Sequence, residues 1–122
     1  MESSLAPGVE HRLEVVVGPE HTPPHLRPIV VLSTPRMVEF MEQVCLEAAQ
    51  PHLGDDETSV GVHLDISHDS AAREGERVVF RCRLERVDGR RLHFSVHAAV
   101  DDQVVGAGTH DRYVVDRSRF GG

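Results

Sequence analysis

Apolar residues recur at every second position through most of the second half of the chain, and this pattern limits the fold more than any other feature. A period of two is typical of β-strands with one buried face. Asp88-Gly89, a two-residue hairpin signal, and Asp101-Asp102 mark turns between the segments. The predicted strands cover residues 59–68, 76–87, 92–100 and 103–115. Four consecutive strands with short connections predict an antiparallel meander.

The same alternation predicts which side chains face the core. In the first of these strands the expected inward residues are Val60, Val62, Leu64 and Ile66. In the second they are Val78, Phe80, Cys82 and Leu84. His68 continues the first series, which places an ionisable imidazole at the margin of the core.

One helix precedes these strands. Ser33-Thr34-Pro35 supplies a hydroxyl N-cap, which we assign to Thr34, followed by a proline suited to the first helical turn. One broad apolar face follows, made of Met37, Val38, Met41, Val44, Cys45, Ala48 and Ala49. Pro51 and Gly54 end the helix after about four turns.

The remaining segments complete a single α+β domain, in which one long helix packs on an antiparallel sheet of about five strands. Residues 1–11 are expected to be a flexible lead-in, and residues 12–120 the domain, beginning with a strand at 12–17. Three prolines between residues 23 and 28 exclude a regular helix or a central strand there. That segment is expected to be a loop that covers a neighbouring surface as a lid.

Composition excludes several classes of function. A net charge of −7 argues against nucleic-acid binding. The longest apolar run, Ile29 to Leu32, is too short to cross a membrane, and residues 1–8 do not have the pattern of a signal peptide. Two cysteines form neither a disulfide framework nor a zinc site, so a cytoplasmic location is expected.

Nine histidines invite a metal hypothesis, but their spacing disfavours it. His93 and His97 share a strand face about 13 Å apart, too far for one ion, while His63 and His68 point to opposite faces. We therefore predict no metal. Arg90 and Arg91 at the hairpin tip suit a phosphate, although charged tips are often simply solvated.

Two ionisable residues occupy awkward positions. His68 is either a core-edge histidine satisfied by a backbone carbonyl or an acid–base group. Glu42 lies beside the apolar helix face, and is either a solvated boundary residue or a carboxylate held for chemistry. From the residues alone, the structural explanation is favoured for both.

In combination, these segments resemble the fluoroacetyl-CoA thioesterase-like branch of the hotdog-fold thioesterases. The resemblance covers residues 32–120. The matching segments are Ser33-Thr34-Pro35 with Met41-Glu42, then Ser59-Val60-Gly61, His68, Asp88-Gly89-Arg90-Arg91-Leu92 and Gly106-Ala107-Gly108-Thr109-His110.

The resemblance implies hydrolysis of a small acyl-CoA thioester to a carboxylate and free CoA. It places the catalytic residues at Thr34, Glu42 and His68, and an acyl-pocket glycine at Gly61. We add Arg90, Arg91 and His110 as substrate-binding residues. No cofactor is implied, since coenzyme A is part of the substrate. A homodimer joined edge to edge is implied, with a dimer of dimers as a further assembly.

Two points remain open in the sequence. Thr34 and Glu42 are eight residues apart, about 12 Å along a helix, so they must act on different parts of a substrate, across a dimer, or from a bent helix. The family's lid carries phenylalanines, whereas residues 23–28 here read Pro-Pro-His-Leu-Arg-Pro.

The main alternative function is a non-catalytic hotdog module that binds acyl-CoA as a sensor or scaffold. A hydratase is disfavoured because its Asp-x4-His helix spacing is absent.

Overall fold

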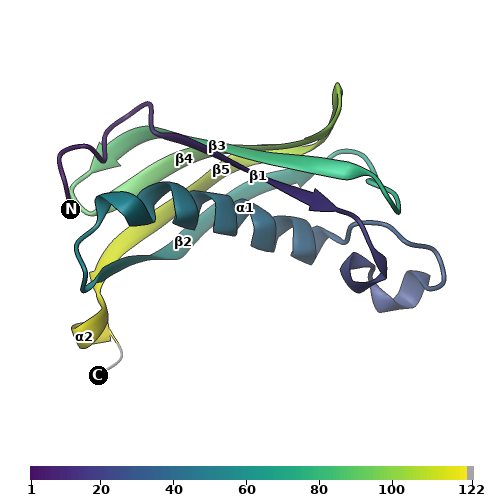
Figure 1. The fold of residues 1–122 in the computed structure, drawn as a ribbon, viewed down its shortest axis with the longest axis horizontal. Coiled ribbons are helices and arrows are strands. Elements are labelled where there is room, and N and C mark those ends of the chain that lie inside the picture. The colour runs from purple at the N-terminus through teal and green to yellow at the C-terminus, as the bar shows by residue number, and fades with distance from the viewer. Residues whose placement is uncertain (121–122) are drawn as a thin grey trace.

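The long helix α1, Thr34–Ala49, lies across one face of a five-stranded sheet in a computed structural model that describes residues 1–120 (Figure 1). The strands are β1 Glu10–Val16, β2 Glu57–His68, β3 Arg77–Asp88, β4 Arg91–Val100 and β5 Gln103–Asp116. Short helical turns are η1 Pro19–His21, η2 Pro24–Leu26, η3 Gln50–His52 and α2 Arg117–Phe120. The predicted α+β architecture, with one helix and five strands, is confirmed.

Ser33, and not Thr34, caps the helix. The Ser33 hydroxyl accepts a hydrogen bond from the Arg36 backbone N–H at 3.2 Å, so Thr34 is the first helical residue and Pro35 the second. The assignment of the cap to Thr34 was therefore wrong. A serine at this position satisfies one of the free amides of the first turn, which leaves the Thr34 side chain available to another partner.

The helix buries the face that its periodicity predicted. Met37, Met41, Val44, Cys45, Ala48 and Ala49 are buried, while Val38 is half-buried. They pack on the inward side chains of β3 and β4, among them Phe80 and Phe94. This apolar layer between helix and sheet is the core, and it holds α1 at a fixed height above the strands.

The strand order is β1-β3-β4-β5-β2, so only β3, β4 and β5 form a meander. The prediction of a four-strand meander was wrong for β2, which pairs antiparallel with β5 at the opposite edge of the sheet. β1 takes the place beside β3, where Leu13 lies opposite Phe80. Residues 69–76 connect β2 to β3 and are long enough to cross the sheet between them. The alternation within each strand does not reveal such a crossing.

A β-bulge interrupts β2 at Val62. Gly61 lies opposite Arg112 of β5. The next residue of β5 on the helix-facing side is His110, and it lies opposite Leu64 where regular pairing would place residue 63. The extra residue reverses the alternation, so the predicted inward positions of Val60 and Val62 were wrong. Val62 and Leu64 are 47% and 39% exposed, because β2 is an edge strand. The bulge also brings Gly61 and His68, seven residues apart, onto the same helix-facing side.

The N-terminal residues are packed and not a flexible lead-in. Leu5 is buried in the core, and the backbone N–H groups of Glu2 and Gly8 donate to the carbonyls of His52 and Leu84 at 2.9 and 2.8 Å. That prediction was therefore wrong: the chain joins the domain well before residue 12. None of the helices within residues 1–120 has the length and apolar character needed to span a membrane.

Candidate functional site

Thr34 and His68 meet where the start of α1 passes the end of β2. The Thr34 Oγ1 lies 2.7 Å from His68 Nδ1, which is hydrogen-bonding distance for a hydroxyl and an imidazole. Both side chains retain contact with solvent, since Thr34 is exposed and His68 half-buried. A hydroxyl bonded to the nitrogen of an imidazole is the arrangement that activates a nucleophile.

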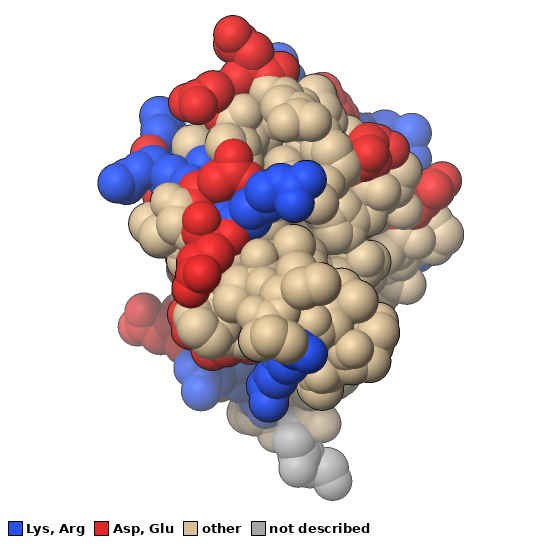
Figure 2. All heavy atoms as spheres, turned by 90° about the vertical axis from the view of Figure 1, so that its right-hand side faces the viewer, with Lys and Arg blue, Asp and Glu red and all other residues tan. Residues whose placement is uncertain are grey.

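A hollow of about 530 Å³ opens over this pair. One wall is the proline-containing segment, with Pro23, His25 and Leu26, and the other is His68 at the end of β2 with residues 69–71 that follow it. The segment is tied to the helix start, because the Ser33 N–H donates to the carbonyl of His21 at 2.9 Å. The predicted lid thus stands beside Thr34 as a fixed wall built on two short helical turns. Uncharged residues cover much of the end of the molecule that carries these turns (Figure 2).

Glu42 occupies a second position, in the middle of α1. Its side chain is 38% exposed and is directed at Gly61 on β2. A Cβ built on Gly61 would lie 2.7 Å from Glu42 Oε2 and 3.0 Å from His110 Cε1. A glycine is therefore required for the carboxylate to approach the strand so closely.

A buried arginine lies behind Glu42. Arg112 on β5 donates from Nε to Ser59 Oγ at 2.7 Å and from Nη2 to the Ser59 carbonyl at 2.8 Å. Its Nη1 is 3.1 Å from His110 Nε2 and 4.0 Å from Glu42 Oε2. Burial lowers the pKa of the Arg112 guanidinium, while Cys45 and Glu42 act in the opposite direction. An arginine still remains charged at neutral pH.

Sequence reasoning missed Arg112 and Ser59. The signal was present in β5, because Arg112 has the same parity as His110 and Val114, whose side chains face the helix. Arginine in a strand is normally read as an outward residue, and only the buried neighbours on either side mark it as an inward one.

The structure does not bring all three predicted catalytic residues together in one chain. Thr34 and His68 are in contact, but Glu42 is about 12 Å further along α1. Gly61, which Glu42 faces, is seven residues and about 23 Å from His68 along β2. The helix shows no bend that would close this gap, since it runs unbroken from Thr34 to Ala49.

The other predicted substrate-binding residues lie apart from Thr34. Arg90 donates to Glu57 Oε2 and to the Val114 carbonyl, at the opposite end of β2 from His68. Arg91 donates to Asp111 Oδ2 at 2.9 Å. His110 is completely buried, so in this chain it reaches the candidate site only through its neighbours.

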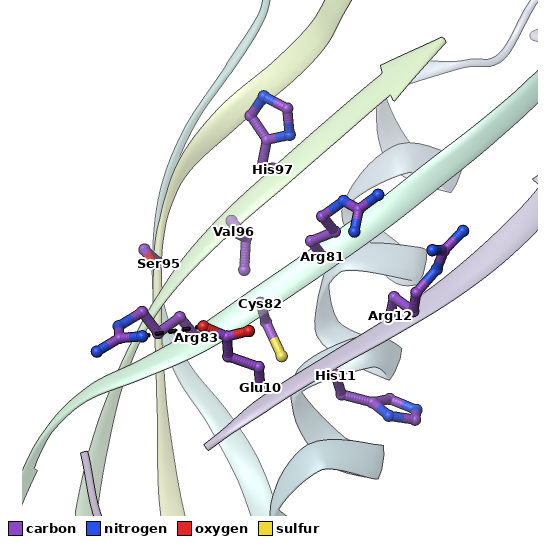
Figure 3. A pocket seen from close by; sticks show the side chains of 9 residues that line it. All are labelled: Glu10, His11, Arg12, Arg81, Cys82, Arg83, Ser95, Val96 and His97. Carbon is purple, nitrogen blue, oxygen red and sulfur yellow. Dashed lines mark hydrogen bonds and ion pairs between the residues drawn. The ribbon is translucent and has the colours of Figure 1, made fainter. Parts of the chain in front are cut away.

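A larger hollow of about 700 Å³ lies over β1, β3 and β4 (Figure 3). Arg12, Arg81 and His97 line it, together with the ion pair of Glu10 and Arg83. Its hydroxyl, on Ser95, donates to the exposed Glu85 carboxylate at 2.7 Å, and its thiol, on Cys82, is buried and faces the Val44 carbonyl. Neither group is bonded to an imidazole. Its size does not make it the site of chemistry, and the hollow at Thr34 and His68 is the better candidate.

Comparison with known proteins gives consistent results. Residues 17–118 match the family model of the fluoroacetyl-CoA-specific thioesterases. The chain is 33% identical to the fluoroacetyl-CoA thioesterase of Streptantibioticus cattleyicolor, over 98% of this chain and 92% of that protein.

Solved structures agree. The crystal structure of the fluoroacetyl-CoA thioesterase FlK superposes with a TM-score of 0.88 at 30% identity, covering 96% of this chain and 93% of that one. A thioesterase superfamily member from Thermus thermophilus gives 0.86 at 28% identity, covering 94% and 87%. The predicted hotdog fold and thioester hydrolase activity are confirmed. The chain belongs to the fluoroacetyl-CoA-specific thioesterase family.

Proposed function

We propose that this protein hydrolyses a small acyl-CoA thioester to the carboxylate and free coenzyme A. The observation that carries the proposal is the 2.7 Å contact of Thr34 Oγ1 with His68 Nδ1 at the floor of a hollow. The pair combines a nucleophile or water-orienting hydroxyl with a base that also serves as an acid.

The chemistry follows from this geometry. The Thr34 hydroxyl donates its hydrogen bond to His68 Nδ1. The oxygen that attacks the thioester carbonyl belongs either to Thr34 or to a water that Thr34 holds, and His68 accepts the proton of this oxygen during the attack. The C–S bond breaks as the tetrahedral intermediate collapses, and His68 returns the proton to the departing thiolate. Pro35 has no N–H and the Arg36 N–H is held by Ser33, so the Thr34 N–H is the amide of the first helical turn suited to stabilise the oxyanion. If Thr34 attacks, water then releases the acyl group in a second cycle of the same kind.

Glu42 joins this site across a dimer. β2 is an edge strand, and its exposed apolar residues, Val62 and Leu64, lie at its middle. Antiparallel pairing of two β2 strands about that point would bury both residues and satisfy the free backbone groups of the edge. The homodimer, and a pair of such dimers, are therefore our proposals for the assembly.

Such pairing shortens the distance between the Thr34–His68 pair of one subunit and the Glu42–Gly61 pair of the other. Gly61 of the partner subunit would lie opposite residues 64–67, at most about 13 Å along the strand from His68. In the same chain the separation is about 23 Å. Glu42 of the partner subunit faces that glycine, so its carboxylate would approach the thioester from the side opposite Thr34. Arg90 of the partner subunit would also be carried to the His68 end, where a CoA phosphate would meet it.

The lid sets the acyl preference. Pro23, His25 and Leu26 line the hollow here. FlK is specific for fluoroacetyl-CoA, and a variant of it has been solved with fluoroacetate and CoA. Because a proline- and histidine-containing wall replaces phenylalanines, we propose a small acyl group without selectivity for fluorine.

The remaining expectations follow the same lines. The reaction needs no added cofactor, because coenzyme A arrives with the substrate. Both cysteines are free thiols, which supports a cytoplasmic location.

The test is release of free thiol from a panel of CoA esters that includes acetyl-, fluoroacetyl-, propionyl- and butyryl-CoA. We expect turnover of at least one short ester, lost on His68→Ala substitution. Binding of CoA esters by calorimetry with no turnover of any of them would instead identify a non-catalytic acyl-CoA-binding module.

A further inference from the structure

Two arginines and a histidine stand side by side on three neighbouring strands, on the face of the sheet that points away from α1. Arg12 of β1 lies opposite Arg81 of β3, and Arg81 lies opposite His97 of β4. All three residues are exposed, and all three line the hollow of about 700 Å³ (Figure 3). The proposed hydrolysis of a thioester uses none of them.

This arrangement is unfavourable for the chain alone. Residues directly opposite each other in a sheet have Cβ atoms about 5 Å apart, and like charges at that separation destabilise it. Glu14 binds Arg12 and offsets part of this cost, whereas within residues 1–120 the side chains of Arg81 and His97 make neither a hydrogen bond nor an ion pair. Their N–H groups are therefore available to an anion from outside the chain.

The hollow is locally positive in an acidic protein. The chain has a net charge of −7, yet the charged residues that line this hollow are three arginines and one glutamate, besides two histidines. The glutamate, Glu10, is bound to Arg83 at 2.9 Å, so it does not neutralise Arg81. A concave surface lined by one sign of charge raises the local concentration of ligands with the opposite sign.

A second hollow on the same face shares the two cations. Arg81 and His97 also line a hollow of about 490 Å³, together with the half-buried Val79 and Ala99. The two side chains thus stand between two concave surfaces and can contact a ligand that extends into both. The apolar side chains of the second hollow offer a surface for an uncharged part of such a ligand.

We propose that Arg81 and His97, with Arg12 beside them, bind a small molecule that carries a diphosphate group. Each arginine offers a planar fork of N–H donors, which matches the oxygens of a phosphoryl group in a bidentate contact. Neighbouring strands are about 4.8 Å apart, so the three residues span about 10 Å, which is more than one phosphate or carboxylate needs. The site is separate from Arg90, which we assign above to the phosphates of CoA.

The test is calorimetric titration of the protein with inorganic pyrophosphate. Arg81→Gln is expected to raise the Kd on the order of 10-fold, because it removes charge-assisted hydrogen bonds, and His97→Gln to raise it by a smaller factor. Arg86→Gln is the matched control. Arg86 is an exposed arginine of the same strand that lines neither hollow and contacts His93, so its loss changes the net charge equally. It is expected to leave the Kd nearly unchanged.

Coenzyme A also carries a diphosphate, so the same titration is made with Arg90→Gln. We expect Arg81→Gln to weaken pyrophosphate binding without raising KM for an acyl-CoA, and Arg90→Gln to do the reverse. A wild-type protein that does not bind pyrophosphate would overturn the proposal. So would equal losses of binding in Arg81→Gln and Arg86→Gln, or a larger loss in Arg90→Gln than in Arg81→Gln.

Urea unfolding gives a readout that does not depend on thioesterase activity. Without ligand, Arg81→Gln is expected to be at least as stable as the wild type, because the repulsion from Arg12 is removed. Saturating pyrophosphate is expected to raise the urea midpoint of the wild type and not that of Arg81→Gln. An equal rise in both proteins would contradict the site. A change of sedimentation on Arg81→Glu, with no effect of pyrophosphate, would instead assign this face to a second copy of the chain.

Discussion

Thr34 Oγ1 and His68 Nδ1 lie 2.7 Å apart, although 34 residues separate them in the chain. The contact exists because the first turn of α1 and the last residue of β2 reach the same end of the sheet. We expect Thr34→Ala to lower kcat/KM on the order of 100-fold, because His68 loses the hydroxyl that it activates or that orients its water. Thr34→Ser, which keeps the hydroxyl, is expected to retain more activity than Thr34→Ala in the thiol-release assay.

Ser33→Ala tests whether the helix cap contributes to stability alone or also to catalysis. The Ser33 side chain satisfies the Arg36 N–H, so its removal is expected to lower the free energy of unfolding by about 1 kcal/mol. Activity is expected to change little at a temperature where the variant stays folded, because the Thr34–His68 contact remains. A loss of activity as large as that of Thr34→Ala would assign the function to the wrong hydroxyl.

Gly61→Ala tests how closely Glu42 approaches β2. The new Cβ would lie 2.7 Å from Glu42 Oε2 and 3.0 Å from His110 Cε1, so the carboxylate has to move. We expect a loss of kcat of about 10-fold or more with a smaller effect on unfolding. Gly54→Ala is the control, since its Cβ would make only ordinary contact with Glu57 at 3.5 Å. Equal activity of the two variants would show that the position of Glu42 is unimportant.

Leu64→Glu tests the dimer. Leu64 is 39% exposed at the middle of the edge strand, where the proposed pairing would bury it. A carboxylate there is expected to shift the protein to monomers in sedimentation velocity and to reduce activity with them. Val16→Glu, on the opposite edge strand β1, is expected to leave the assembly unchanged. A monomeric wild-type protein with full activity would contradict the proposed assembly.

Asp111 is expected to make stability depend on pH. Burial of the Asp111 carboxylate raises its pKa, but hydrogen bonds from Arg91 and His93 outweigh this effect and hold the pKa below its ordinary value. A pKa lowered in the folded state contributes stability above the unfolded value, near 3.8, and loses it as the pH falls through the folded value.

Asp111→Asn is therefore expected to cost about 2 kcal/mol at pH 7, and progressively less than that below pH 4. Urea unfolding of both proteins across this range measures the difference. A cost that stays constant down to pH 3 would show that the amide disturbs packing and that the charge is not responsible.

Much of the fold was predictable from local chemistry. Ser33-Thr34-Pro35 marks the helix start, and the inward residues of β3, from Val78 to Leu84, follow strict alternation. Such patterns are decided by neighbours in the sequence, so they can be read without knowing the partner strands. The predicted helix ended within a residue or two of its observed end at Ala49.

What escaped prediction depends on contacts between distant segments. The bulge at Val62 reverses the faces of β2, and nothing in residues 59–68 marks it except a glycine. β1 lies beside β3 and β2 pairs with β5, an order of distant strands that the alternation within each strand does not determine. Arg112 looked like a surface residue because its partners, Ser59 and Glu42, are 53 and 70 positions away.

Glu42 could be singled out as a boundary residue, but not placed relative to His68. A helical wheel gives the direction of a side chain around its axis, while the distance between Glu42 and His68 depends on how two chains pair. The separation of the Glu42–Gly61 and Thr34–His68 groups within one chain is the main reason to place the complete site between two subunits.

Complementation of two inactive variants tests this arrangement most directly. His68→Ala and Glu42→Gln are each expected to be nearly inactive as homodimers. After unfolding and refolding as an equal mixture, half of the dimers contain one subunit of each kind. If Thr34 and His68 of one subunit work with Glu42 of the other, one of the two sites in each mixed dimer is intact. The mixture should then recover about a quarter of wild-type activity. A mixture as inactive as its components, with mixed dimers verified by mass spectrometry, would contradict the shared site.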